Sequence, residues 1–215
     1  DLYCPTMSLP HVLGTTLATI PRQIPYLAAD PARVERWRSR LKHLDGFKVG
    51  LTWAGNPDLV QDRQRSIALD RLDVFATVPG VVLVSLQKGP EAVQIRARTS
   101  GMVVHDWTDE LEDFDETAAL IETLDLVISV DTSIVHLAGA LGKPVWLLNR
   151  FDTCWRWLLD RDDSPWYPTL RQFRQPRRND WETVLKDVRT ALEQLTEVNR
   201  RGSIRSENAA GQEAI

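Results

Sequence analysis

The 215-residue sequence lacks the marks of several protein classes. No apolar run approaches the roughly 20 residues that span a bilayer. The first residues have neither the basic start nor the long apolar stretch of a signal peptide. Acidic residues outnumber basic ones by 30 to 26, whereas nucleic-acid-binding surfaces normally need a basic excess. We therefore expect a cytoplasmic protein with no transmembrane segment and no nucleic-acid partner. The sequence does not begin with methionine, and we expect it to be a fragment of a longer chain.

Cysteine is scarce, and common catalytic motifs are missing. Cys4 and Cys154 are the only two cysteines, so no pair of CxxC motifs exists and no zinc framework is predicted. Two free thiols are the simpler interpretation, and a disulfide is the alternative. A dehydrogenase would show GxGxxG after its first strand, and a hydrolase would show GxSxG; neither occurs, nor does a Walker sequence. The DxD pattern at residues 160–162 lies in an acidic stretch without a strand before it, so we predict no metal site.

From residue 47 onward, the sequence alternates between predicted strands and predicted helices. Strands are predicted at 49–53, 81–86, 102–105, 126–130 and 145–148. Helices are predicted at 69–76, 90–98, 117–124 and 133–141. Such alternation is typical of right-handed βαβ crossovers and a parallel sheet. The predicted fold class is therefore α/β, a Rossmann-like doubly wound parallel sheet, over residues 46–176.

Flanking segments complete the predicted organisation. Residues 1–45 begin Pro-rich and continue as a helix that Asp30 caps and Gly46 closes. That helix has one apolar face, formed by Val34, Trp37, Leu41 and Leu44, and we expect this face to pack against the main domain or the C-terminal helix. Residues 177–199 form an amphipathic C-terminal helix. The Gly-, Ser-, Asn- and Glu-rich tail at 200–215 is predicted to be disordered.

Ligands of open parallel sheets bind beyond the carboxyl ends of the strands, which directs attention to three junctions. At the first, Asp131 follows a strand, and Thr132 and Ser133 can cap the next helix while outward-facing N–H groups attract a phosphate. His136 follows in the first turn, within reach of a phosphate oxygen, and a protonated ring would bind it better. The alternative is an ordinary capped junction with a locally packed histidine. Gly139 would let this helix approach the sheet closely.

The other two junctions carry cations. The loop 52–66 contains two arginines, Arg63 and Arg65, that could neutralise a diphosphate. After the next strand, Lys88 could bind phosphate, and Glu91 could accept hydrogen bonds from a ribose or sugar hydroxyl. A solvated loop and an ordinary turn are the respective alternatives.

At these same junctions, the sequence resembles glycosyltransferase family 9. The stretch 47–175 is similar to the C-terminal domain of that family, especially in bacterial proteins that join tetratricopeptide repeats to such a domain. The matching residues are 50–57, 62–63, 65–67, 85–89, 131–133, 136–140, 155–157 and 164–168.

The resemblance implies a GT-B architecture, of which this chain would be the C-terminal, donor-binding half. It implies that the donor phosphates contact Asp131, Thr132, Ser133 and His136, with Arg65 facing the diphosphate; Lys88 is added from its own junction. Glu91 is the implied sugar or nucleoside contact, and Gln87, in the matching stretch 85–89, is predicted to share that role. Ser133 stands where the heptosyltransferases commonly have glycine, so the donor sugar can differ.

The implied function is metal-independent transfer of a sugar from a nucleoside-diphosphate donor, with no other cofactor. The N-terminal half of the GT-B fold usually supplies the catalytic base, and here residues 1–45 would be only its remnant and a linker helix. No catalytic residue is therefore assigned. The expected partners are the nucleotide sugar and an N-terminal GT-B or tetratricopeptide-repeat domain. The alternatives are a non-catalytic nucleotide-sugar-binding or regulatory module and a fragment of a GT-B-like sugar epimerase.

Overall fold

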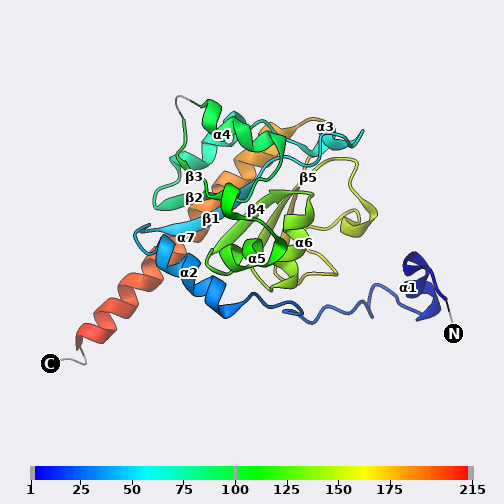
Figure 1. Ribbon diagram of the computed structural model, residues 1–215, viewed down its shortest axis with the longest axis horizontal. Coiled ribbons are helices and arrows are strands. Elements are labelled where there is room, and N and C mark those ends of the chain that lie inside the picture. Colours follow the sequence, from blue (N-terminus) through cyan, green and yellow to red (C-terminus); the bar gives the residue numbers. More distant parts are fainter. Residues whose placement is uncertain (1–2, 99–100, 213–215) are drawn as a thin grey trace.

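A computed structural model describes residues 3–98 and 101–212, and a six-stranded parallel sheet lies at its centre (Figure 1). The strands are β1 Phe47–Thr52, β2 Val81–Ser85, β3 Val104–His105, β4 Leu126–Val130, β5 Val145–Asn149 and β6 Leu170–Arg174. Their order is β3-β2-β1-β4-β5-β6, with every neighbouring pair parallel. The order reverses direction between β1 and β4, which makes that gap the topological switch point. The predicted doubly wound α/β fold is confirmed.

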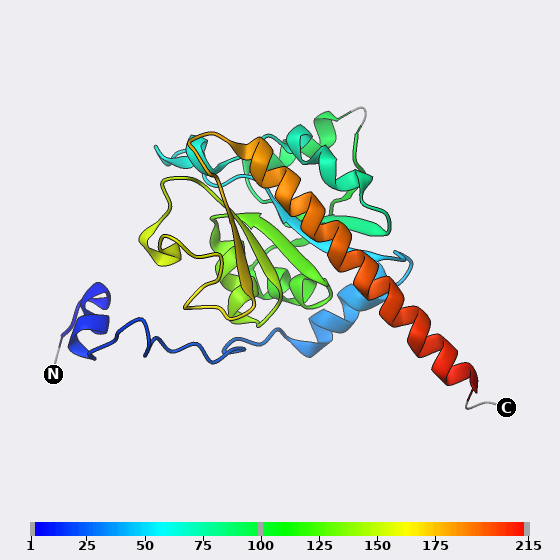
Figure 2. The same ribbon diagram turned by 180° about the vertical axis from the view of Figure 1, so that it is seen from behind.

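Helices cover both faces of the sheet. The α-helices are α1 Leu9–Val12, α2 Pro31–Leu41, α3 Asp62–Arg65, α4 Val93–Ala97, α5 Phe114–Glu122, α6 Ser133–Ala140 and α7 Trp181–Gln212. The 3-10 helices are η1 Thr6–Ser8, η2 Leu69–Thr77, η3 Pro90–Ala92, η4 Thr108–Glu110 and η5 Trp155–Trp157. Helices α2, α5 and α6 lie on one face, and α7 crosses the other (Figures 1 and 2). No helix within residues 3–98 and 101–212 is both long and apolar enough to cross a membrane.

Two apolar clusters hold these layers together. Leu126, Ile128 and Val130 pack with η2 and α7, while Val127 and Val145 pack with α2, α5 and α6. Strands β4 and β5 are buried along their whole length because both of their faces are covered. Alternate residues of one strand therefore pack into different apolar clusters.

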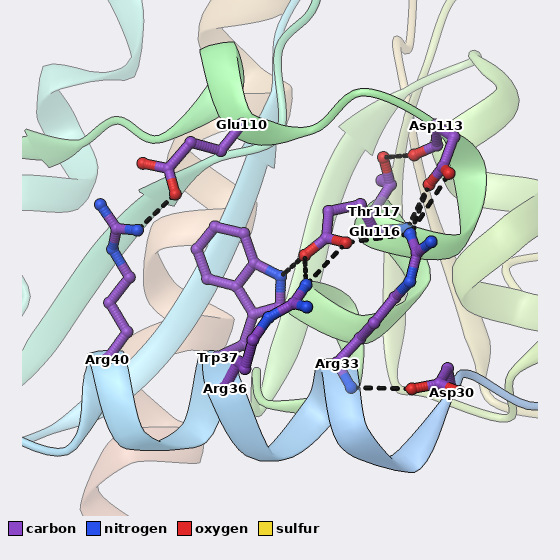
Figure 3. Close-up of polar contacts among 9 residues, drawn as sticks. All are labelled: Asp30, Arg33, Arg36, Trp37, Arg40, Glu110, Asp113, Glu116 and Thr117. Atoms are coloured by element: carbon purple, nitrogen blue, oxygen red, sulfur yellow. Dashed lines mark hydrogen bonds and ion pairs between the residues drawn. The ribbon is translucent and has the colours of Figure 1, made fainter.

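Helix α2 docks on α5, as its apolar face predicted. Asp30 caps it by accepting a hydrogen bond from the Arg33 backbone N–H at 2.9 Å. Trp37 and Leu41 are buried in the cluster that includes α5, and Val34 packs against it. Figure 3 shows the polar side of this contact, where α2 arginines reach carboxylates on and before α5. The segment before α2 is hydrogen-bonded to α6 at one point, while α1 stands away from the sheet (Figures 1 and 2).

Several elements differ from the sequence prediction. The expected helix at 69–76 is the 3-10 helix η2, in which the three-residue spacing of Leu69, Leu72 and Phe75 aligns these buried side chains. The expected helix at 90–98 divides into η3 and α4, and α5 begins three residues earlier than predicted because Asp113 caps it. The strand β6 was not predicted.

Helices α7 and α2 both end at other residues than the sequence predicted. Helix α7 continues to Gln212, whereas the composition of 200–215 predicted disorder; this stretch includes the helix formers Ala, Glu, Gln and Arg. Residues 213–215 lie outside the described residues. Gly46 does not close α2, which ends at Leu41. With φ of 127°, Gly46 instead allows the Gly80 carbonyl to approach, where a Cβ atom would lie 2.5 Å away.

Candidate functional site

A pocket of about 640 Å³ opens at the carboxyl ends of β1, β2 and β4. It therefore lies at the switch point of the sheet, where open α/β folds bind ligands. Three loops line it: residues 52–57 after β1, residues 86–90 after β2, and residues 131–136 after β4. The structure thus brings together most of the predicted site residues, namely Arg65, Gln87, Lys88, Asp131, Thr132, Ser133 and His136. Glu91 is the exception.

The start of α6 presents uncapped backbone N–H groups to the pocket. Thr132 is the N-cap residue, with the extended backbone of that position, but its side chain makes no capping hydrogen bond in the described structure. Its hydroxyl instead lies 3.2 Å from the Ser129 hydroxyl. Ser133 is exposed. The expected side-chain cap is therefore absent, and the first-turn N–H groups and the helix dipole are left to attract an anion.

Arg65 joins the loop after β1 to the loop after β4. Its Nε donates to Asp62 at 2.8 Å, and its Nη1 donates to the Asp131 carbonyl oxygen at 2.7 Å. Asp62 is buried, and the Ser66 hydroxyl donates to its other carboxylate oxygen. A Cβ atom on Gly55 would lie 2.3 Å from the guanidinium, so a side chain there would have to displace Arg65 from its present position. Arg65 is therefore held rigidly at the pocket wall, with its positive charge beside the α6 N-terminus.

Gln87 lines the pocket and also has a structural role. Its Oε1 accepts from the backbone N–H groups of Trp53 and Ala54, at 3.0 and 2.9 Å. Its Nε2 donates to the carbonyl oxygens of Ala54 and Lys88. Because the side chain is buried and both ends of its amide are engaged, it fastens the two loops to each other.

Lys88 and Glu91 are drawn partly away from the pocket. Lys88 lines the pocket, but its Nζ donates to the Thr108 carbonyl oxygen at 2.7 Å. Glu91 does not line the pocket, since its carboxylate accepts a hydrogen bond from Gln94, which in turn accepts from the Leu69 backbone N–H. The predicted sugar or nucleoside contact by Glu91 is therefore not supported by its position.

His136 is enclosed by aromatic side chains. Its ring stacks on Trp157 with a centroid separation of 5.2 Å and an interplanar angle of 17°. Its Nδ1 lies 3.0 Å from the Tyr167 hydroxyl. Burial lowers the pKa of His136 below its ordinary 6.5, with Arg156 lowering it further and Asp131 opposing the shift. The lowered pKa favours a neutral ring, whereas the sequence predicted a protonated phosphate partner.

The environment of His136 predicts a pH-dependent stability. The unfolded chain takes up a proton at His136 before the folded chain does, so the free energy of unfolding should fall as the pH drops below about 6.5. His136→Asn keeps an acceptor near the Nδ1 position and removes the titration. Urea unfolding from pH 7.5 to 5.5 should therefore show a smaller loss of stability in this variant than in the wild type. Equal losses would mean that His136 contributes nothing to the acid sensitivity.

The sequence interpretation missed Arg156 as a site residue, although it lies in one of the matching stretches. Arg156 lines the main pocket from η5, with its guanidinium 5.0 Å from the Trp155 ring centroid. It also borders an adjoining hollow of about 390 Å³, together with Arg65, Asp131 and Arg150. A surface arginine in a three-residue 3-10 helix gives no periodic signal, so only its neighbourhood in space reveals it.

The structure also bears on the predictions made for the cysteines, for a metal site and for Gly139. Cys4 and Cys154 are free thiols. Among the described residues, no group of three His, Cys, Asp or Glu side chains is arranged to hold a metal ion. Gly139 lets the Tyr167 ring approach α6, at 2.6 Å from where a Cβ atom would lie, so the predicted close approach is to this ring and not to the sheet.

These features define a Rossmann-like α/β domain with a candidate site for an anionic ligand at its switch point. Residues 111–148, from the approach to α5 through β5, match the family model described as glycosyltransferase family 9 (heptosyltransferase). Over 186 residues, the chain is 34% identical to Protein FlbA of Caulobacter vibrioides, covering 84% of this chain and 31% of that protein.

Of two solved structures, the first supports the fold. The Escherichia coli ADP-heptose lps heptosyltransferase II superposes with a TM-score of 0.54 at 13% identity, covering 82% of this chain and 56% of that one. A family 9 glycosyl transferase from Veillonella parvula has a TM-score of 0.49 at 13% identity, covering 84% and 52%. The chain is thus similar to family 9 in a sequence segment that includes the α6 junction and, through the E. coli protein, in fold. It spans about a third of FlbA and little more than half of the heptosyltransferase.

Proposed function

We propose that this chain is the nucleotide-sugar-binding half of a metal-independent GT-B glycosyltransferase. The observation that carries the proposal is the uncapped α6 N-terminus facing a switch-point pocket beside Arg65. A diphosphate matches this wall because fixed N–H groups and a guanidinium both bind phosphate oxygens. The similarity to family 9 supports a nucleoside-diphosphate sugar as the source of that diphosphate.

In the proposed reaction, this half stabilises the leaving group. As the bond from the anomeric carbon to the diphosphate oxygen breaks, negative charge develops on the nucleoside diphosphate. Arg65, Arg156 and the first N–H groups of α6 would stabilise that charge, and Arg65 would do so without rearranging, since Asp62 and the Asp131 carbonyl already hold it. The acceptor site and its base would belong to another domain, either the N-terminal half of a GT-B fold or one joined to tetratricopeptide repeats.

Binding of nucleoside diphosphates is the direct test. We expect ADP, UDP or their sugars to bind this chain with at most millimolar Kd, equally well in magnesium and in excess EDTA. Titration calorimetry of the chain against each compound measures this. If no nucleoside diphosphate binds at millimolar concentration, the proposal fails. If binding requires magnesium, the metal-independent mechanism fails.

A further inference from the structure

Tyr167 contacts His136, one of the residues that line the pocket. It follows η5 in the chain and is 31 residues from His136, whose Nδ1 is 3.0 Å from the Tyr167 hydroxyl. The phenol ring is buried and lies against Gly139, one turn along α6 from His136. A side chain at position 139 would displace this ring, because its Cβ atom would lie 2.6 Å from two ring carbons.

We propose that Tyr167 is a positioning residue: its hydroxyl donates to His136 Nδ1, which keeps the imidazole proton on Nε2 as a hydrogen-bond donor for the diphosphate in the pocket. This proposal rests on the proposed function, because it assigns a role to a wall residue of that same site. The Tyr167 hydroxyl itself contacts the histidine and acts on the ligand only through it.

The direction of this hydrogen bond follows from the chemistry of the two groups. A neutral imidazole nitrogen is a much stronger base than a phenol oxygen, so the pair is more stable with the hydroxyl donating and the nitrogen accepting. Burial raises the pKa of the Tyr167 phenol, and the nearby Tyr26 hydroxyl raises it further, so the phenol keeps its proton. With Nδ1 accepting and the ring neutral, the one imidazole proton resides on Nε2.

Packing fixes the orientation of the ring as well as its proton. Trp157 is fully buried and stacks on His136, while the Tyr167 ring meets the imidazole at 60° and a centroid distance of 5.8 Å. These contacts oppose a ring flip that would exchange the two nitrogens. Nε2 makes no hydrogen bond to any of the described residues, and His136 lines the pocket. A protonated Nε2 suits a phosphate oxygen, whereas a bare nitrogen would repel it.

The test compares Tyr167→Phe with the matched control Tyr3→Phe, which removes the same hydroxyl from a tyrosine that is 90% exposed. Long-range ¹H–¹⁵N spectra of histidine-labelled protein at pH 7.5 report which ring nitrogen carries the proton. The chain has four histidines, and His136→Asn identifies the relevant signal. We expect the wild type and Tyr3→Phe to show the His136 proton on Nε2. We expect Tyr167→Phe to show a mixture of the two tautomers or a changed rate of exchange between them.

Affinity for ADP and UDP provides the second readout. Loss of one hydrogen bond that orients the donor should weaken binding about three- to tenfold in Tyr167→Phe and leave it unchanged in Tyr3→Phe. A wild-type proton on Nδ1, or a Tyr167→Phe variant with unchanged spectrum and affinity, overturns the proposal. If the wild type binds neither nucleotide, the proposed function fails, while the spectra of the wild type and Tyr167→Phe still decide whether Tyr167 sets the tautomer.

Discussion

Replacing Arg65 with methionine is expected to weaken the binding of a nucleoside diphosphate by roughly 30- to 150-fold. Hydrogen bonds to charged groups contribute about 1.5–3 kcal/mol, and each 1.4 kcal/mol corresponds to about tenfold in Kd. Arg65 should reach the upper part of this range because its side chain is 19% exposed and already held by Asp62 and the Asp131 carbonyl. Little ordering is then required when the ligand binds. Titration calorimetry with ADP and UDP measures the change.

Two further variants separate charge from folding at this position. Arg63→Met removes the same charge from an exposed residue of the same helix, α3, and should alter affinity less than twofold. Arg65→Lys keeps the charge but loses the planar fork, so an intermediate affinity is expected. Arg65→Met leaves the buried Asp62 carboxylate without its cation, so a lower melting temperature is also expected. If Arg65→Met binds as the wild type does, the diphosphate lies elsewhere in the pocket.

The parallel core of this fold is readable from the sequence, whereas its outer strand is not. Strands β4 and β5 are apolar throughout, because they are covered on both faces, and this run of apolar residues is itself the signal. Strand β6 contains the buried residue Gln172, whose side-chain amide is fully hydrogen-bonded. The amide donates to the carbonyl oxygens of Trp157 and Asp163 and accepts from Asn149. A buried glutamine looks like a surface residue in sequence, so the strand lacks an apolar pattern.

For the candidate site, too, the sequence predicts the location but not the role of each residue. The position of Asp131 and His136 follows from a general rule, since side chains just beyond the strand ends of a parallel sheet converge. The individual roles do not follow from it. Gln87 and Glu91 are polar residues at a predicted junction, yet one fastens loops together and the other turns toward Gln94. Likewise, the lowered pKa of His136 depends on burial beside Trp157, 21 residues along the chain, which no local pattern encodes.

The contact between α2 and α5 centres on one carboxylate, and its neutralisation is expected to release α2. Glu116 accepts hydrogen bonds from Arg33 at 2.9 Å, Arg36 at 2.7 Å and the Trp37 indole N–H at 2.9 Å (Figure 3). The Glu116 side chain is only 13% exposed, so solvent screens its interactions with the arginines less than it would at the surface. We expect Glu116→Gln to lower the free energy of unfolding by about 2 kcal/mol, because Arg36 loses its carboxylate, Arg33 keeps only Asp113, and an amide N–H replaces an acceptor.

The matched control for this change is Glu110→Gln, which removes the same charge from the same interface. Glu110 pairs with Arg40, and both side chains are more than 40% exposed, so its loss should cost at most about 0.5 kcal/mol. Urea unfolding measures both stabilities, and amide exchange measured by mass spectrometry reports on residues 31–41. Faster exchange of these residues is expected in Glu116→Gln alone. If the two variants lose equal stability, or if α2 exchanges at the wild-type rate in Glu116→Gln, then the apolar face of Trp37 and Leu41 suffices to hold α2 and the ionic cluster adds nothing to its docking.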